Sequence, residues 1–276
     1  MDRLSQDETV RSRQRERRRH PWTLGNHRTN ARPGPVSTWY PMTLSRIGRL
    51  ARSLLTLNRD REYAVLKRFL SLKANDWLLD IGSGDGFWSA RFATHCGQII
   101  GLDPDDQLQE LALRFHVRPN VRYVRGVAES LPFPDRSFDK VTSVSCLEHF
   151  ADPMQGLREM ARVLKPGGRL AISVDSLLPE NSRASFREWH KSRYFVTEYF
   201  SETKLIEMMK NAGLHCEPER TVHLFRSGAA RASRQTFVRQ ARLMLPLFPV
   251  FYCLARLGDR FGGNEHGQII IVTATR

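Results

Sequence analysis

The sequence has few cysteines, no long unbroken apolar run and no leading apolar segment. The four cysteines in 276 residues show no CxxC or CxH spacing, so we interpret them as reduced thiols of a cytosolic protein. The longest apolar stretch, Leu243–Leu257, is broken by Pro246, Pro249 and Arg256, whereas a membrane span needs about 20 apolar residues. The first 35 residues are polar and Arg-rich, unlike a secretory signal. We therefore expect a cytoplasmic protein, free or peripheral on the inner face of the membrane.

Acidic residues are too few to balance the basic ones, with 29 Asp and Glu against 43 Lys and Arg. The excess lies in two flanks, because residues 1–60 hold 13 Arg and 5 acids and residues 219–263 hold 8 Arg and 2 acids. Residues 61–218 hold 21 of each sign. An excess of arginine suits an anionic membrane or nucleic acid, and biased base composition explains it equally well. Since the body of the chain is neutral, we place any anionic partner on a docking surface and favour a membrane over nucleic acid.

The first 60 residues contain two different patterns. Residues 1–41 have no apolar period and are rich in Arg, Pro and Gly, which predicts a disordered basic arm. The segment 42–60 has leucines and an isoleucine at three- and four-residue steps over 43–57, beside three arginines. This spacing predicts an amphipathic helix, either a lid on the following domain or a helix lying in a membrane interface.

From residue 61 onward, short apolar runs alternate with helical spacing, which predicts a parallel sheet built of βαβ units. The runs are Trp77–Ile81, Gln98–Asp103, Val121–Val127, Phe138–Ser143 and Arg169–Val174. After them we expect a polar connection (175–199), a helix near Glu202–Asn211, a strand near Thr221–Phe225, a basic and then apolar insert (226–263) and a last strand, Gln268–Thr273.

A glycine-rich turn links the first predicted strand to a helix, in the pattern Asp80-x-Gly82-x-Gly84-x-Gly86. Glycine lets the backbone approach a ligand closely, and the helix N-terminus behind it presents N–H groups. The dinucleotide-binding fingerprint would need glycine at position 87, where this chain has Phe87.

The pattern resembles motif I of the class I S-adenosylmethionine-dependent methyltransferases, in the subgroup of methyltransferase type 11 and quinone-biosynthesis enzymes. Further similar segments are Gly126–Phe133, Leu147-Glu148-His149 and Leu164–Gly168, so the resemblance covers about 61–225 and the last strand. It implies an α/β fold with a Rossmann-like, doubly wound, seven-stranded sheet, mostly parallel with an antiparallel last strand. The domain would occupy 61–276 and include the insert.

The resemblance also implies S-adenosyl-L-methionine as cofactor. Asp103 matches the acid that holds the ribose hydroxyls, and an acceptor-only carboxylate suits two hydroxyl donors. Val127 replaces an aspartate of the family. Ser145 stands where metal-associated relatives carry an acid, so no metal site is expected. The expected cofactor-binding residues are Asp80, Gly82, Ser83, Gly84, Gly86, Asp103, Pro104, Ala128, Glu129 and Ser145.

Proton removal from the acceptor needs a base near the methyl group, and the candidate is His149, in the loop after the fourth predicted strand. The alternative is a structural histidine that caps the helix beginning near Pro153. Glu148 is the second candidate. Four residues of the polar connection would line the acceptor pocket or simply form ordinary surface: His190, Lys191, Tyr194 and Tyr199.

The predicted activity is methyl transfer to a small-molecule, lipid-like or glycan acceptor, on oxygen or carbon. The segments 43–57 and 226–263 are candidates for contact with an anionic membrane, and the second is alternatively a helical cap over the sheet. The rival hypotheses are a nucleic-acid-binding or nucleic-acid-modifying protein and a methyltransferase fold without turnover.

Overall fold

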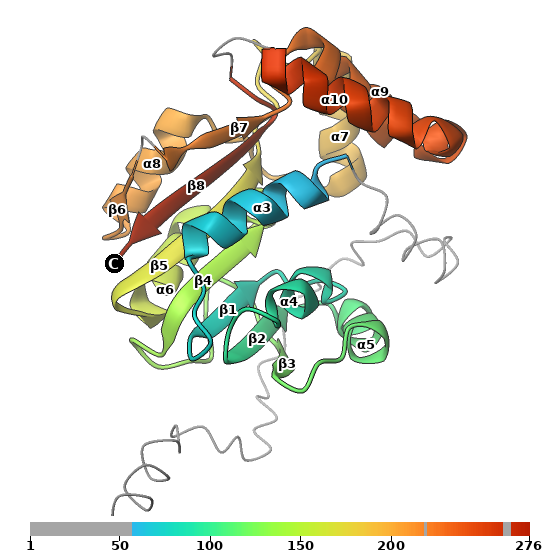
Figure 1. Ribbon diagram of the computed structural model, residues 1–276. Coiled ribbons are helices and arrows are strands. Elements are labelled where there is room, and N and C mark those ends of the chain that lie inside the picture. Colours follow the sequence, from blue (N-terminus) through green and yellow to red (C-terminus); the bar gives the residue numbers. More distant parts are fainter. Residues whose placement is uncertain (1–56, 218–219, 262–265) are drawn as a thin grey trace, which may run out of the picture. The chain divides into compact units, whose positions relative to one another are not determined.

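The computed structural model describes residues 57–217, 220–261 and 266–276 (Figure 1). The predicted arm over 1–41 and nearly all of the helix predicted over 42–60 lie outside these residues. The described residues form one mixed sheet in the order β3-β2-β1-β4-β5-β8-β6, with β7 also paired to β8. The strands are β1 (Trp77–Ile81), β2 (Gln98–Asp103), β3 (Val121–Arg125), β4 (Phe138–Val144), β5 (Leu164–Asp175), β6 (His215–Cys216), β7 (Val222–Leu224) and β8 (Ile269–Thr275).

Strands β1 to β5 are parallel, and helices cover both faces of the sheet, as the near-continuous burial of β1, β2 and β4 requires. Helices α3 (Arg59–Leu70) and α4 (Phe87–Phe92) pack into the core of one face, and α6 (Pro153–Val163) and α8 (Glu202–Asn211) into that of the other (Figure 1). Helix α5 (Asp106–Phe115) connects β2 to β3.

The antiparallel end of the sheet follows the predicted plan with one addition. Strand β8 runs antiparallel to β5, and its two halves pair on the other side with separate short strands. Strand β6 pairs with Ala274 and Thr275, whereas β7 pairs with 269–271. The predicted α/β fold class is therefore confirmed, and β6 is a short strand that the sequence patterns did not indicate.

The predicted polar connection over 175–199 contains a helix, α7 (Ala184–Tyr194), and on this point the prediction was wrong. Only Phe186 and His190 of this helix are buried, so its sequence carries almost no apolar period. The basic and apolar insert folds as two helices, α9 (Gly228–Met244) and α10 (Phe248–Phe261), that pack against each other. No helix among the described residues is both long and apolar enough to cross a bilayer.

Helices α7, α9 and α10 gather at the end of the sheet toward which β4 and β5 point (Figure 1). The buried carboxylate of Asp259 fixes α10 in this position. It accepts hydrogen bonds from the backbone N–H groups of Phe225 (2.7 Å) and Arg226 (2.6 Å) and pairs with Arg61 of α3. One carboxylate thus joins the insert both to the chain leaving β7 and to the helix on the face of the sheet.

Removing this carboxylate tests its structural role. We expect Asp259→Ala to lower the free energy of unfolding by about 3–5 kcal/mol, because two N–H groups and a largely buried guanidinium lose their acceptor. Urea unfolding measures the change. The control is Asp60→Ala, which breaks an exposed ion pair with Arg91 and should cost less than about 1 kcal/mol. Equal losses in the two variants would contradict the assignment.

Candidate functional site

The glycine-rich turn lies between β1 and α4, and all three of its glycines have positive φ, from 55° to 82°. A Cβ on Gly82 would lie 2.1 Å from Sγ of Cys146, and one on Gly86 would lie 2.3 Å from Oη of Tyr123. A Cβ on Gly84 would meet no atom within 4 Å. Gly82 and Gly86 therefore allow close packing of the turn, whereas Gly84 leaves an open face that a ligand can approach.

Asp103 ends β2 beside this turn. Its carboxylate accepts hydrogen bonds from the N–H groups of Gly84 (2.8 Å) and Asp105 (2.9 Å), one on each oxygen. Burial raises the pKa of Asp103, and these two N–H groups oppose the shift. Each oxygen keeps a lone pair for a further donor, which suits the two ribose hydroxyls that the family resemblance implies for this residue. Pro104 follows it in the loop before α5.

Two further polar groups under the turn are buried. Asp80 accepts a hydrogen bond from Ser89 Oγ (2.6 Å) on one oxygen, while its other oxygen and Ser83 Oγ have no partner among the described residues. Burial raises the pKa of Asp80 to about 7. These groups, Asp103 and the open face at Gly84 fit a ligand that brings both hydroxyl donors and positive charge, as S-adenosylmethionine does.

The segment after β3 lies close to the loop that precedes α6. Ala128 is buried in the core, and the Glu129 carboxylate accepts hydrogen bonds from the N–H groups of Ala151 (2.9 Å) and Asp152 (3.3 Å). Glu129 therefore orders the loop after β4, a contact that sequence reasoning missed. Its expected contact with the cofactor stays a prediction.

The chain turns sharply where β4 ends. Ser145 has a positive φ of 48°, which is uncommon for a residue with a side chain, and its N–H donates to the backbone oxygen (2.9 Å) and the hydroxyl (3.2 Å) of Ser173. Its own hydroxyl donates a long hydrogen bond of 3.5 Å to Glu62 of α3. The turn thus brings the predicted cofactor residue Ser145 next to a buried acid that the sequence patterns did not single out.

His149 and Glu148 lie in the short 3-10 helix (Leu147–His149) after this turn. Burial lowers the pKa of His149, so the imidazole is neutral at pH 7, as a general base must be. The alternative role as a helix cap is wrong, because Asp152 caps α6 by accepting a hydrogen bond from the Gln155 N–H.

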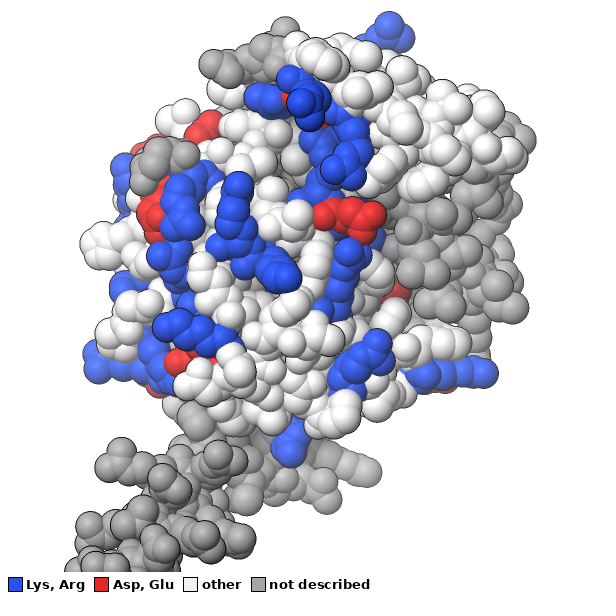
Figure 2. All heavy atoms as spheres, in the orientation of Figure 1, with Lys and Arg blue, Asp and Glu red and all other residues white. Residues whose placement is uncertain are grey.

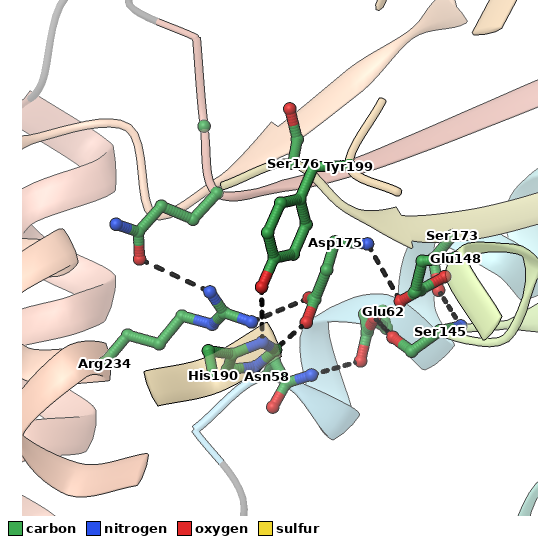
Figure 3. A network of polar contacts seen from close by, with 12 residues as sticks. Asn58, Glu62, Ser145, Glu148, Ser173, Asp175, Ser176, His190, Tyr199 and Arg234 are labelled. Atoms are coloured by element: carbon green, nitrogen blue, oxygen red, sulfur yellow. Dashed lines mark hydrogen bonds and ion pairs between the residues drawn. The ribbon is translucent and has the colours of Figure 1, made fainter. Parts of the chain in front are cut away.

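A buried polar network lies at the ends of β4 and β5 (Figure 3). Asp175, the last residue of β5, contacts Arg234 Nη2 at 2.7 Å with one oxygen and His190 Nε2 at 3.3 Å with the other. Burial lowers the pKa of His190 to about 4 despite the neighbouring carboxylate, so we take its ring as neutral. Nε2–H then donates to Asp175, and Nδ1 accepts from the Tyr199 hydroxyl (3.0 Å). The Asp175 N–H donates to Glu148 (3.1 Å).

An open pocket of about 570 Å³ lies next to this network, between the loop before α6 and helix α7. Of the four residues named for a possible acceptor pocket, Lys191 and Tyr199 line this one, whereas His190 belongs to the buried network. Tyr194 packs its ring against His190 at 4.7 Å between centroids. The other lining residues are Ala151, Pro153, Leu177, Leu178, Pro179, Arg187, Glu188, Thr197 and Glu198.

One group of possible metal ligands exists in the described part of the chain, away from the glycine-rich turn, formed by Glu202, His223 and His266. His223 already uses both ring nitrogens, since Nε2 donates to Glu202 (2.9 Å) and Nδ1 accepts from the Gly267 N–H (3.2 Å). Coordination through Nε2 would move the ring proton to Nδ1, where it would face that N–H group. We therefore interpret the group as a hydrogen-bonded link between α8, β7 and the start of β8.

Comparison with known proteins agrees with this geometry. A family model described as methyltransferase domain matches residues 79–172, from β1 to β5. An uncharacterized methyltransferase of Bacillus subtilis is 41% identical over 138 residues, which are 49% of this chain and 54% of that protein. A demethylmenaquinone methyltransferase of Clavibacter sepedonicus is 33% identical over 150 residues, 54% of this chain and 61% of the relative. The chain thus spans little more than half the length of these relatives.

Solved structures share the fold. Phosphoethanolamine N-methyltransferase 2 of Haemonchus contortus, in complex with phosphomonomethylethanolamine and S-adenosylhomocysteine, has a TM-score of 0.64 at 21% identity and covers 89% of this chain and 62% of its own. The YcgJ protein of Bacillus subtilis has a TM-score of 0.53 at 22% identity and covers 79% of this chain and 96% of its own. At these identities the likeness concerns the fold alone.

Asp103 provides the most direct test of the site. We expect Asp103→Ala to weaken binding of S-adenosylhomocysteine by about 10- to 100-fold, because bonds to a charged acceptor contribute about 1.5–3 kcal/mol. Titration calorimetry measures the affinity. Asp106→Ala, which removes an exposed carboxylate paired with Arg125 just after the same loop, should leave it unchanged. Unchanged affinity in Asp103→Ala would remove this residue from the site.

Proposed function

We propose that this chain is a class I S-adenosylmethionine-dependent methyltransferase that methylates a small-molecule acceptor of lipid-like character. The main support for this activity is the geometry of the glycine-rich turn. Its open residue, Gly84, donates a backbone hydrogen bond to the Asp103 carboxylate, so that both lie at one site. The cofactor supplies a methyl group already activated on a sulfonium, so the protein has mainly to align the acceptor with it.

The residues of this chain would bind the cofactor, accept a proton and hold the acceptor. Gly84 and Asp103 would hold the nucleoside and the methionyl end, and Ser145 would lie beside the latter. His149, neutral because burial lowers its pKa, would take the proton that an oxygen or nitrogen acceptor loses. The pocket lined by Lys191 and Tyr199 offers room for an acceptor on the same edge of the sheet.

The base assignment is tested by transfer of a tritiated methyl group into a fractionated cell extract, which also identifies the class of acceptor. We expect His149→Ala to slow transfer by about 10²- to 10⁴-fold while leaving cofactor affinity unchanged. With the acceptor in hand, the wild-type rate should fall only at a pH below the usual histidine range near 6.5, because a lowered pKa keeps the ring unprotonated to lower pH. His215→Ala, an exposed histidine of β6, is the control. Wild-type turnover in His149→Ala would exclude this residue as the base.

A second observation favours a membrane as the place of action. Helix α10 and the turn before it expose a row of large apolar side chains at three- and four-residue steps, each between 46% and 80% exposed: Leu247, Val250, Leu254, Leu257 and Phe261. We call them the α10 stripe. The exposed side chains of Arg256 and Arg260 lie on the same helix. An apolar stripe beside arginines is the arrangement of a helix that lies in the interface of an anionic bilayer.

Nucleic acid fits one face of the described residues less well. On the face shown in Figure 2, Lys and Arg side chains form several groups separated by neutral and acidic ones. A protein that follows a phosphate backbone presents a continuous basic face. A demethylmenaquinone methyltransferase among the relatives also supports an apolar small-molecule acceptor.

Vesicle sedimentation tests the membrane proposal. We expect the full chain to bind vesicles containing phosphatidylglycerol, to bind pure phosphatidylcholine vesicles more weakly, and to lose binding when Leu254→Asp and Leu257→Asp are combined. The control is Leu113→Asp, an exposed leucine of α5. Equal binding by the α10 double variant and the control would show that the stripe is not the contact surface.

A further inference from the structure

Three carboxylates are buried together at the edge of the sheet that carries the site: Glu62 of α3, Glu148 after β4 and Asp175 of β5 (Figure 3). Glu62 and Glu148 are each 1% exposed. A buried carboxylate is costly unless a cation or several hydrogen bonds satisfy it. The partners of the three acids therefore decide what the cluster can bind.

Asp175 is fully satisfied, because Arg234 and His190 occupy its two oxygens. The donors to Glu62 are neutral: the Asn58 amide (2.5 Å), the Ser145 hydroxyl (3.5 Å) and the side chain of Ser173. Glu148 accepts one backbone N–H on one oxygen, and its other oxygen has no partner within the described part of the chain. No cationic side chain of the described residues forms an ion pair with Glu62 or Glu148.

Charged groups on every neighbouring element act on these two acids. The charge of Asp175 opposes ionisation of both acids, and Glu62 opposes that of Glu148. Arg59 of α3 and Arg234 of α9 favour ionisation of Glu62. Burial, followed by Asp175, raises the pKa of Glu62 to about 7 and that of Glu148 well above its ordinary range. Within the described part of the chain these two acids therefore have no ion-pair partner, and burial favours their protonated forms.

We propose that Glu62 and Glu148 form a subsite, next to Ser145, that binds an ammonium group. This inference rests on the proposed function, because two sources of an ammonium can reach that edge of the sheet. One is the amino group of the cofactor's methionyl end, and the other is an amine on the acceptor. Binding of either would replace the protons by a cation, so that the carboxylates ionise and release protons to solvent.

Calorimetric titration with S-adenosylhomocysteine, in buffers of different ionisation enthalpy, counts the protons released. If the cofactor supplies the ammonium, the wild type should release protons near pH 7 and bind more tightly as pH rises from 6 to 8. In that case Glu62→Gln should abolish most of the release and weaken binding by about 10- to 100-fold, since it loses a charge-assisted bond. The exposed Glu207→Gln is the matched control.

Two further ligands distinguish the sources. The deamino analogue of S-adenosylhomocysteine lacks only the amino group, so Glu62→Gln should not alter its affinity if the cofactor supplies the ammonium. If the acceptor supplies it, phenethylamine should raise the melting temperature of the wild type saturated with S-adenosylhomocysteine, and not that of Glu62→Gln. Glu62→Gln should unfold no more easily than the wild type, because it removes an unpaired buried acid.

Three results would overturn the inference. The first is a Glu62→Gln variant that releases as many protons and binds S-adenosylhomocysteine as tightly as the wild type, combined with no effect of phenethylamine on the melting temperature of the wild type. The second is equal weakening of S-adenosylhomocysteine and its deamino analogue, and the third is a large loss of stability in Glu62→Gln, which would make the residue structural. Absence of any S-adenosylhomocysteine binding by the wild type would refute the proposed function itself, and the subsite with it.

Discussion

The ion pair between Asp175 and Arg234 organises the carboxyl edge of the sheet. Asp175 ends β5 and Arg234 lies on α9, 59 residues later, and both side chains are at least nine-tenths buried. A buried charge without its partner costs several kcal/mol of stability. If the helical insert moved away from this edge, Asp175 would lose Arg234 and become such an unpaired buried charge. The Asp175 carboxylate also orients His190 of α7, and the backbone N–H of Asp175 donates a hydrogen bond to Glu148. The short helix after β4, strand β5 and helices α7 and α9 therefore all depend on this one ion pair.

This pair also sets the electrostatics around the site. Because Arg234 is committed to Asp175, its charge only partly compensates the neighbouring acids, and the pKa of Glu62 stays near 7. His190 contributes no positive charge, since burial keeps its ring neutral. The edge is consequently rich in carboxyl groups whose ionisation depends on what binds there. A cationic group would be favoured at this edge, and an anionic one would face repulsion.

The parts that could be predicted from the sequence are those specified by local patterns. The bounds of β1, β2 and α8 were predicted correctly to the residue, because short apolar runs and helical periods stand between clear turn residues. The glycine turn and Asp103 were also recognisable, and the structure brings them together. Helix α7 was missed because it buries a polar network instead of an apolar stripe. Glu62 and Arg234 were missed because nothing near them in sequence marks a partner more than 50 residues away.

The structure also changes how the basic insert is understood. The eight arginines over 219–263 do not form one surface, because Arg234 neutralises Asp175, and Arg226 donates to the backbone oxygen of Asp259 inside the fold. Among the described side chains, outward ones such as Arg256 and Arg260 are open to a partner, and these two lie on the helix that carries the α10 stripe. A net charge therefore identifies a partner only after the internally paired residues are set aside. Since the same insert carries the stripe outside and supplies Arg234 inside, contact with a bilayer would bear directly on the edge of the sheet where the acceptor is expected to bind.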